Sequence, residues 1–435
     1  MIRAALLTAA AAIAVIAAPA AAQDFTITNA IVVTGDGSAP IEDGTVVVAG
    51  GKVVYAGPRA GSGAGPATGG AVVDAAGKWV TPGIFMPVTD LGLVDVEGVS
   101  STNDTRAGRA RFSAALDAST AVNYASEHIA VSRAGGVTRA SIVTAPANAI
   151  FAGQGAVIDT GADRNAVVAT RTFQLVALGE AGGRIAGGSR VAAYAELANA
   201  MREASDFAAG RWQGDGNLLT RADAQALAAV VTGSQPLYIH VERAADIRAV
   251  LGLRQQYGRL RLVLLGASEG WLVADDIAAA GVPVIADPLE NLPSSFEQLA
   301  ATHSNVGRMV QAGVKVALGG LSGGITGPRT APQFAGNLVA LTRVPGATGL
   351  SWGQAFASIS SIPAEIAGFG GRYGVLARGA AGDVVIWDGD PLEVSTAPVQ
   401  VFIDGIQQPL DSHQSRLRDR YRDLDESTLP KAYDW

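Results

Sequence analysis

The chain has 435 residues, of which 49% are hydrophobic and 16% are charged, and its formal net charge is −7. A chain of this length and apolar content can bury a large core, which excludes disorder and coiled coil as overall descriptions. The acidic balance and the lack of a basic patch argue against a nucleic-acid partner. Because there is no Cys, disulfides, zinc–thiolate sites and thiol nucleophiles are excluded, and only four His and four Lys remain.

Residues 1–22 read as a secretory signal peptide. One early charge, Arg3, precedes an apolar stretch that ends in Ala20-Ala21-Ala22, which fits cleavage before Gln23. The alternative is a transmembrane anchor, but the segment is rich in Ala and is interrupted by Pro19. We therefore expect a periplasmic protein without a stable membrane anchor.

The mature chain begins with β-rich segments and then changes to alternating strands and helices. Residues 25–80 contain short Val- and Thr-rich runs separated by Gly and Asp, which is typical of a β-meander. Strands and Ala-rich helices then alternate, which indicates parallel βαβ units, although no strand is assigned between about 145 and 221. The predicted strands are Val137–Val143, Leu237–Val241, Arg261–Leu265, Val282–Ala286 and Lys315–Leu318. The predicted helices include Ala222–Thr232, Ala244–Tyr257, Trp271–Ala280 and Ser304–Ala312.

After Pro363 strand-like sequence patterns occur again, and a charged tail follows them. The strand-like segments are GDVVIWDGDPLE and VQVFIDGIQQPL. We predict an α/β protein, a TIM-like (β/α)8 barrel with a small composite β-sandwich domain built from both chain ends. Residues 23–80 would begin the small domain, 81–362 form the barrel, 363–410 end the barrel and return to the small domain, and 411–435 form the tail. The tail would be an exposed helix or would dock on the body.

Several motifs occur in the order and spacing of one enzyme superfamily. They are DGTVVVAGGKVVYAG, VVDAAGKWVTPG, AGGVTRASIV, YIHVERAADI, LVLLGASEGW and GDVVIWDGDPLE. With these motifs the chain resembles the amidohydrolase superfamily, and within it the imidazolonepropionase-like branch, from about Thr26 to Ile406. The resemblance implies hydrolysis of C–N (amide) bonds in small molecules or small peptides, with one or two divalent metals at the carboxyl ends of the barrel strands.

The resemblance places the family's metal-ligand positions on residues that mostly lack a donor. The first strand's His-x-His falls on Val88 and Asp90, and the fifth strand's His is retained as His240. The sixth strand's His falls on Gly266 and the eighth strand's Asp on Leu321. No Lys lies near the fourth strand, so a bridging carboxylated Lys is excluded. His240 and Asp90 therefore remain as candidate ligands for one divalent metal, which would be zinc, manganese or iron, or for none.

Other chemistry is less specific. Asp287 joins His240 and Asp90 in a possible one-His, two-carboxylate set, and with Asn148 and Gln154 it is expected at the rim of the substrate pocket. The carboxylates Asp95, Glu97, Asp104, Glu242 and Glu269 are interpreted as solvated loop residues or helix caps. The segment Gly320-Leu321-Ser322-Gly323-Gly324 has no evident His partner in the sequence, so a Ser nucleophile is not indicated.

Two hypotheses follow. The first is a periplasmic hydrolase of C–N bonds with a nonstandard site at His240 and Asp90, although no catalytic residue can be assigned. The second is a pseudoenzyme that binds a small molecule or serves as the partner subunit of an active amidohydrolase. The fold alone does not choose between them. A homo-oligomer, or a hetero-oligomer with a related amidohydrolase, is compatible with both.

Overall fold

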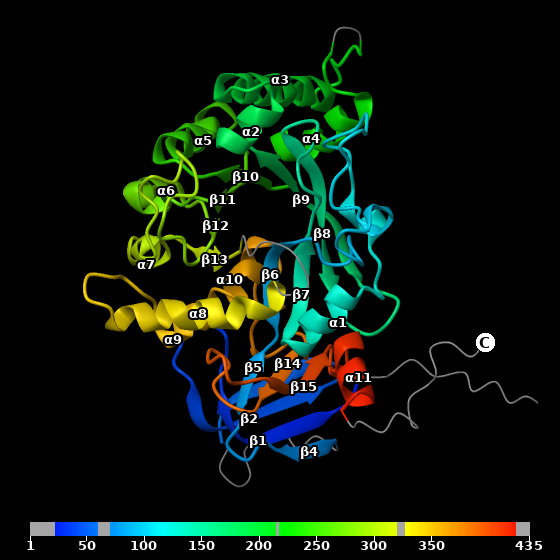
Figure 1. The fold of residues 1–435 in the computed structure, drawn as a ribbon, viewed down its shortest axis with the longest axis vertical. Helices are drawn as coiled ribbons and strands as arrows, with labels where there is room; N and C mark the ends of the chain where they lie inside the picture. The colour runs from blue at the N-terminus through cyan, green and yellow to red at the C-terminus, as the bar shows by residue number, and fades with distance from the viewer. Residues whose placement is uncertain (1–21, 60–69, 215–216, 320–326, 423–435) are drawn as a thin grey trace, which may run out of the picture.

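The computed structural model describes residues 22–59, 70–214, 217–319 and 327–422, in two joined parts, a barrel and a small sheet domain (Figure 1). The predicted signal segment, except Ala22, lies outside the described residues, and so does Leu321. Among the described residues, no helix is long and apolar enough to span a membrane.

Eight strands form the barrel sheet, in the order β13-β12-β11-β10-β9-β8-β7-β6, and β13 comes back beside β6. This nearly closed sheet confirms the predicted TIM-like barrel. The strands are β6 (Ile84–Thr89), β7 (Val137–Ile142), β8 (Phe151–Asp159), β9 (Val167–Ala177), β10 (Leu237–Val241), β11 (Leu262–Gly266), β12 (Val284–Ala286) and β13 (Val316–Leu318).

One strand of the barrel departs from the (β/α)8 pattern. β8 runs antiparallel to both β7 and β9, so β8 and β9 form a hairpin where a parallel barrel would have a crossover helix. Both strands lie in the stretch for which no strand was predicted. The first half of β9 contains polar, exposed residues such as Arg171, which hides its strand character in the sequence.

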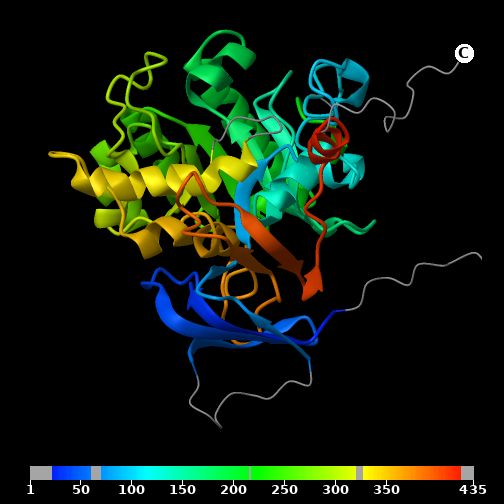
Figure 2. The same cartoon turned by 60° about the horizontal axis from the view of Figure 1, so that its bottom comes forward.

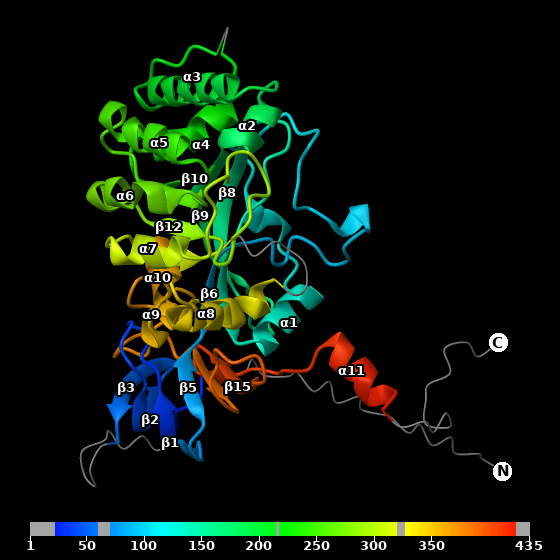
Figure 3. The ribbon, with the colours of Figure 1, turned by 60° about the vertical axis from the view of Figure 1, so that its left-hand side comes forward.

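Helices cover the outside of the barrel, and Figure 3 shows α3, α5, α6 and α7 stacked along one side. The predicted helices agree with the observed ones to within a residue or two, except that the helix predicted from Trp271 begins as a 3-10 turn (η3, Gly270–Val273). The helices are α1 (Glu127–Ala134), α2 (Gly179–Ile185), α3 (Arg190–Ala208), α4 (Arg221–Val231), α5 (Ala244–Gln256), α6 (Ala274–Ala280), α7 (Asn305–Gln311), α8 (Ala331–Ala340), α9 (Trp352–Ala357) and α10 (Ser361–Ile366).

The small domain combines both ends of the chain, as predicted. Its strand β5 pairs with β1 on one side and with β14 on the other, which joins the N-terminal strands to the C-terminal ones. The sheet is strongly curved (Figure 2). Phe25 of β1 stacks on Phe402 of β15 with ring centroids 4.3 Å apart, although β14 and β5 lie between these strands in the sheet order. The strands are β1 (Phe25–Val32), β2 (Ile41–Ala49), β3 (Lys52–Pro58), β4 (Ala71–Asp74), β5 (Trp79–Pro82), β14 (Val384–Trp387), β15 (Pro398–Ile403) and β16 (Ile406–Gln407).

The charged tail begins as helix α11 (His413–Arg420), which has no buried residue. Its start is fixed by a capping box between Ser412 and Ser415, and the His413 N–H donates to the Glu127 carboxylate of α1. The described part of the tail is therefore an exposed helix that is attached to the barrel at its first turn.

A buried arginine joins the two parts. Arg139 of β7 is 2% exposed, and it donates from Nε and Nη2 to the two carboxylate oxygens of Asp383 at 2.7 and 2.9 Å. The same guanidinium contacts Asp404 at 2.7 Å and Asp159 at 3.5 Å, and it lies over the Tyr373 ring. Burial lowers the Arg139 pKa, but the carboxylates outweigh burial and raise it well above its ordinary value. Asp383 precedes β14 and Asp404 follows β15, so one charge ties the small domain to the barrel.

We expect Arg139→Met to lower stability by about 3 kcal/mol or more, because it leaves Asp383 charged, buried and unpaired. The measurement is the shift in the urea or thermal unfolding midpoint of purified protein. Arg59→Met is the matched control, because Arg59 pairs with Asp43 across 3.6 Å in solvent and should change stability by less than about 1 kcal/mol. Equal shifts in the two variants would contradict a joining role for Arg139.

Candidate active site at the barrel mouth

A cavity of about 530 Å³ opens at the carboxyl ends of the barrel strands. Its apolar lining comes from four different strand ends, Val88, Val143, Leu175 and Leu265. These side chains pack on the hydrophobic cluster that fills the barrel interior. Its polar lining includes Asp90, Arg106, His240, Glu242, Asp287 and Glu290. This is where barrels of this type place their reactive groups.

His240 points into the barrel from β10 and is paired with a carboxylate. Alternation along the strand puts it on the same side as Tyr238, which belongs to the interior cluster. The Nε2 atom of His240 lies 3.0 Å from Oε1 of Glu242, and Nδ1 is buried without a hydrogen-bond partner. Burial lowers the His240 pKa, but the hydrogen bond and charge of Glu242 outweigh it, so the pKa is raised. Burial also raises the Glu242 pKa, but the hydrogen bonds from His240 and Ser268 and the charge of His240 outweigh it, so the Glu242 pKa is lowered overall.

The Glu242 carboxylate fills the space beside Gly266. A Cβ added to Gly266 would meet Glu242 Oε1 at 2.3 Å, and the backbone φ of +91° strains any side chain there. With the Glu242 carboxylate in its observed position, position 266 has no room for a side chain and therefore none for a metal ligand. The interpretation of Glu242 as a solvated loop residue is wrong, because it is 7% exposed.

A second carboxylate is linked to Glu242 through a serine. The Ser268 hydroxyl lies 2.6 Å from Glu242 Oε2 and also contacts Glu290 Oε2. A hydroxyl has one proton to donate, so Ser268 donates to one of the two carboxylates at a time. Gln298 Nε2 donates to Ser268 and to Glu290, and completes the network. Nothing in the sequence spacing connects these four residues, which meet only in the fold.

Two further carboxylates face the cavity without such support. Burial raises the pKa of Asp90, and it raises the pKa of Asp287 to about 6. The Asp287 carboxylate accepts a 3.4 Å hydrogen bond from the Leu289 N–H. The Asp90 carboxylate interacts with its own backbone N–H, and within the described residues no other side chain forms a hydrogen bond or ion pair with it. Asp287 thus lies in the cavity, as the sequence predicts, but Asn148 and Gln154 do not line it.

Asn148 and Gln154 lie elsewhere. Asn148 is exposed and donates to the Ala110 carbonyl at 2.6 Å. Gln154 lies on β8 and, with Gln235, lines a different cavity beside α4. Leu321 lies outside the described residues. His128 is 3% exposed inside α1, and its Nδ1 has no hydrogen-bond partner among the described residues.

The described residues do not fit the metal centre that the resemblance implies. Val88 offers no donor, position 266 is filled as described, and Nε2 of His240 is engaged with Glu242. No group of three or more His, Asp or Glu side chains among them is arranged to hold a metal ion. Residues 320–326, which lie beyond the described ranges, contain none of these residue types. Metal binding by His240 and Asp90 therefore stays a prediction, and no step below runs through a metal.

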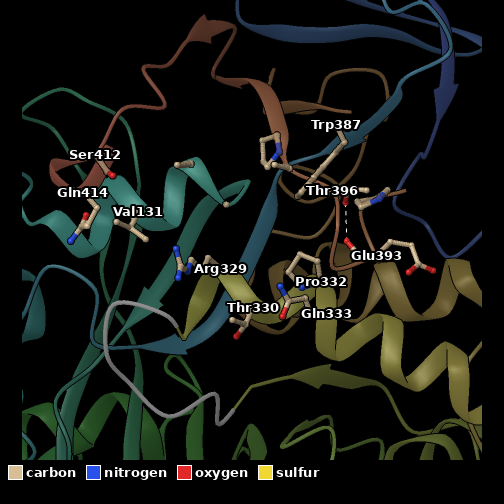
Figure 4. Close-up of a pocket in the computed structure, with 15 residues that line it drawn as sticks. Val131, Arg329, Thr330, Pro332, Gln333, Trp387, Glu393, Thr396, Ser412 and Gln414 are labelled. Atoms are coloured by element: carbon tan, nitrogen blue, oxygen red, sulfur yellow. Dashed lines mark hydrogen bonds between the residues drawn. The ribbon is translucent and has the colours of Figure 1, made fainter. Parts of the chain in front are cut away.

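A second cavity of about 530 Å³ lies on the side of the molecule where α1, α8 and the C-terminal strands meet (Figure 4). Its lining includes Arg329, Gln333, Trp387 and Glu393. It contains no histidine, and its single carboxylate, Glu393, is exposed. The acid–base groups therefore gather at the barrel mouth and not here.

We expect Glu242→Gln to lower the pKa of His240, because the hydrogen bond and charge that stabilise the imidazolium are removed while burial remains. The measurement is an NMR titration of the His240 ring. The pair should stabilise the fold fully between about pH 4.5 and 6.5, which are the ordinary values of Glu242 and His240. Its contribution should fall as pH rises through the raised His240 pKa, and as pH falls through the lowered Glu242 pKa.

Unfolding midpoints of wild type and Glu242→Gln should thus differ most inside this window and converge on both sides. Glu269→Gln is the control, because Glu269 is buried but accepts from the Ala244 and Ala300 N–H groups and not from His240. An unchanged His240 pKa in Glu242→Gln would show that the pair does not form.

Comparison with known proteins agrees with this geometry. Residues 220–407 match the model of an amidohydrolase family. An amidohydrolase of Thermotoga maritima has a TM-score of 0.75 at 23% identity, over 88% of this chain and 99% of its own. Molinate hydrolase has a TM-score of 0.55 at 15% identity, over 90% of this chain and 95% of its own. Phenylurea hydrolase B has a TM-score of 0.53 at 15% identity, over 88% of this chain and 96% of its own.

A curated relative, the amidohydrolase tasK of Hapsidospora irregularis, is 48% identical over 60 residues. That match spans 14% of this chain and 6% of the relative, so it supports the family and not a shared activity. The family model matches less than half of the chain, and the barrel with its composite sheet domain is shared with a solved amidohydrolase, so the chain is similar to the amidohydrolase superfamily in residues 220–407 and in fold.

Proposed function

We propose that this chain hydrolyses a C–N (amide) bond of a small molecule or small peptide bound in the barrel-mouth cavity. The observation that carries the proposal is the Asp287 carboxylate, which lines the cavity at the end of β12 with only one weak hydrogen bond from the chain. Similarity to the superfamily supports the reaction class, since molinate hydrolase and phenylurea hydrolase B, whose names describe hydrolases, share the fold.

The chemistry that Asp287 offers is general base catalysis. Burial raises its pKa to about 6, so at pH 7 it is mostly ionised and is a stronger base than an ordinary Asp. The carboxylate would take a proton from the attacking water as its oxygen adds to the carbonyl carbon and the C=O π bond opens. It would then hand this proton to the nitrogen as the tetrahedral intermediate collapses, which restores the C=O bond and breaks the bond from carbon to nitrogen. The environments push Asp287 and Glu242 in opposite pKa directions, which is a common mark of acid–base sites.

The second candidate is binding without turnover, as a small-molecule binder or as the partner subunit of an active amidohydrolase. The pairing of His240 with Glu242, and the lack of a donor at Val88, favour this alternative. Both remove the usual means of activating a water on a metal in this type of site. Both candidates use the same cavity.

We expect Asp287→Asn to lower kcat by about 100-fold or more, because the base is lost while the shape of the cavity is kept. The assay is release of free amine from a panel of dipeptides, N-acyl amino acids and cyclic imides, with and without added zinc, manganese or iron. Asp104→Asn is the control, because Asp104 is exposed and does not line the cavity.

Unchanged turnover in Asp287→Asn would contradict its role as base. Turnover that requires added metal would contradict the metal-free mechanism. Ligand binding without product, in every metal condition, would establish the second candidate instead. Light scattering on the same protein, alone and mixed with an active relative, measures whether it forms a homo-oligomer or a hetero-oligomer.

We also propose that residues 1–22 direct the chain to the periplasm and are removed there. The supporting feature is the Ala20-Ala21-Ala22 sequence ahead of Gln23. We expect the full chain, expressed in a Gram-negative host, to appear in the periplasmic fraction with Gln23 as its first residue by mass spectrometry. Retention of residues 1–22 in the membrane fraction would show an anchor instead.

A further inference from the structure

Two opposite charges on the barrel-mouth cavity have no oppositely charged partner among the residues that the structure describes. The Arg106 side chain is exposed, lines the cavity, and makes no hydrogen bond or ion pair within the described residues. The Asp90 carboxylate, just after β6, interacts with its own backbone N–H but forms no ion pair or hydrogen bond with another side chain within the described residues. Arg106 and Asp90 line one cavity but form no ion pair with each other, although oppositely charged groups within 4 Å would. The range 320–326 contains no charged residue to neutralise either one.

The loop that carries Arg106 is attached to the barrel. The Ala145 N–H donates to the Thr105 carbonyl at 2.8 Å, and Arg106 and Ala145 form a β-bridge. Arg106 is therefore held over the strand ends by its backbone while its guanidinium is left free. A guanidinium presents several N–H groups in a plane that matches a carboxylate.

Asp90 is free for a different reason. It is half-buried and lines the cavity, and no cationic side chain pairs with it within the described residues, so its carboxylate gains from any cation that enters the cavity. His128 is the basic group that acts on Asp90 from α1, but no ion pair forms between them. Of the other carboxylates of the cavity, Glu242 is occupied by His240 and Ser268, and Glu290 by Ser268 and Gln298. Asp287 accepts one weak hydrogen bond from the Leu289 N–H and is the base of the proposed function.

We propose that the cavity selects a small zwitterion, such as a free dipeptide with apolar side chains, whose carboxylate binds Arg106 and whose protonated amine binds Asp90. Val88, Val143 and Leu265 line the cavity between the charged groups and would contact the apolar side chains. The hydrolysis of such a ligand rests on the proposed function, in which Asp287 is the base. The binding preference itself depends only on Arg106, Asp90 and the apolar lining. A ligand with both charges neutralises both free groups at once, which a metal ion or a simple anion does not.

The test uses four ligands that differ only at their ends, namely alanyl-leucine, its N-acetyl form, its C-terminal amide and the doubly blocked molecule. Affinities are measured by calorimetry at pH 7, where the amine is mostly protonated. We expect alanyl-leucine to bind at least about tenfold more tightly than either singly blocked form. Equal affinities for the four ligands, or no binding of alanyl-leucine, would overturn the proposal.

Variants assign each end of the ligand to its residue. Arg106→Gln should remove the preference for a free carboxylate and keep the preference for a free amine, and Asp90→Asn should do the reverse. Arg109→Gln and Asp104→Asn are matched controls from the same exposed loop, whose side chains do not line the cavity. A variant that failed to fold would lose the preference for a free carboxylate and the preference for a free amine together. Loss of only one preference in each variant therefore shows a change in recognition and not in stability. Preferences that persist in both variants would overturn the assignment.

The same mixtures are assayed for hydrolysis, which separates this inference from the proposed function. Alanyl-leucine that binds selectively but is not cleaved contradicts the proposed function and supports the inference. Cleavage of only the doubly blocked molecule supports the proposed function and overturns the inference. A zinc or manganese ion that competes with alanyl-leucine, and does so no longer in Asp90→Asn, would show that Asp90 serves a metal and would overturn it as well.

Discussion

The ion cluster around Arg139 is the interaction on which the arrangement of the two parts depends. A guanidinium that is 2% exposed cannot be left unpaired, and here Asp383 and Asp404 come from the small domain while Asp159 ends β8 of the barrel. The cluster therefore orients the C-terminal strands on the barrel, and β14 in turn pairs with β5. Because β5 leads directly into β6, the same interaction sets where the first barrel strand begins.

The charges at the mouth of the barrel are arranged differently. Around Arg139, one buried charge meets carboxylates that are fixed by the fold. At the mouth, His240 and Glu242 satisfy each other, and Ser268 and Gln298 satisfy Glu290, but Arg106, Asp90 and Asp287 are left with little or no support from the described chain. Unsatisfied charge costs stability, so its concentration in one cavity indicates a site and not packing.

The sequence predicts the scaffold well and the site only in part. The parallel strands and their helices have strong periodic patterns, so β10 is predicted at its observed bounds, Leu237–Val241. The β8–β9 hairpin is missed, because Gly-rich and polar residues such as Gly153 and Arg171 obscure the alternation. In the site, His240 and Asp287 are found because strand ends can be located in the sequence. The Glu242–Ser268–Glu290 network and Arg106 are not, because their contacts depend on loops whose paths no local pattern specifies.

The relation between Glu242 and Gly266 bears on how this site differs from the metal centre that the resemblance implies. If a ligand at position 266 had merely been lost, the space would be open and a histidine could be restored there. Instead a Cβ at that position meets Glu242 Oε1 at 2.3 Å, and the backbone has a φ of +91°. The Glu242 carboxylate is in turn held by His240, the side chain that a metal would require. A side chain at position 266 would thus displace Glu242 and disturb its pairing with His240, so the described mouth is packed around this carboxylate.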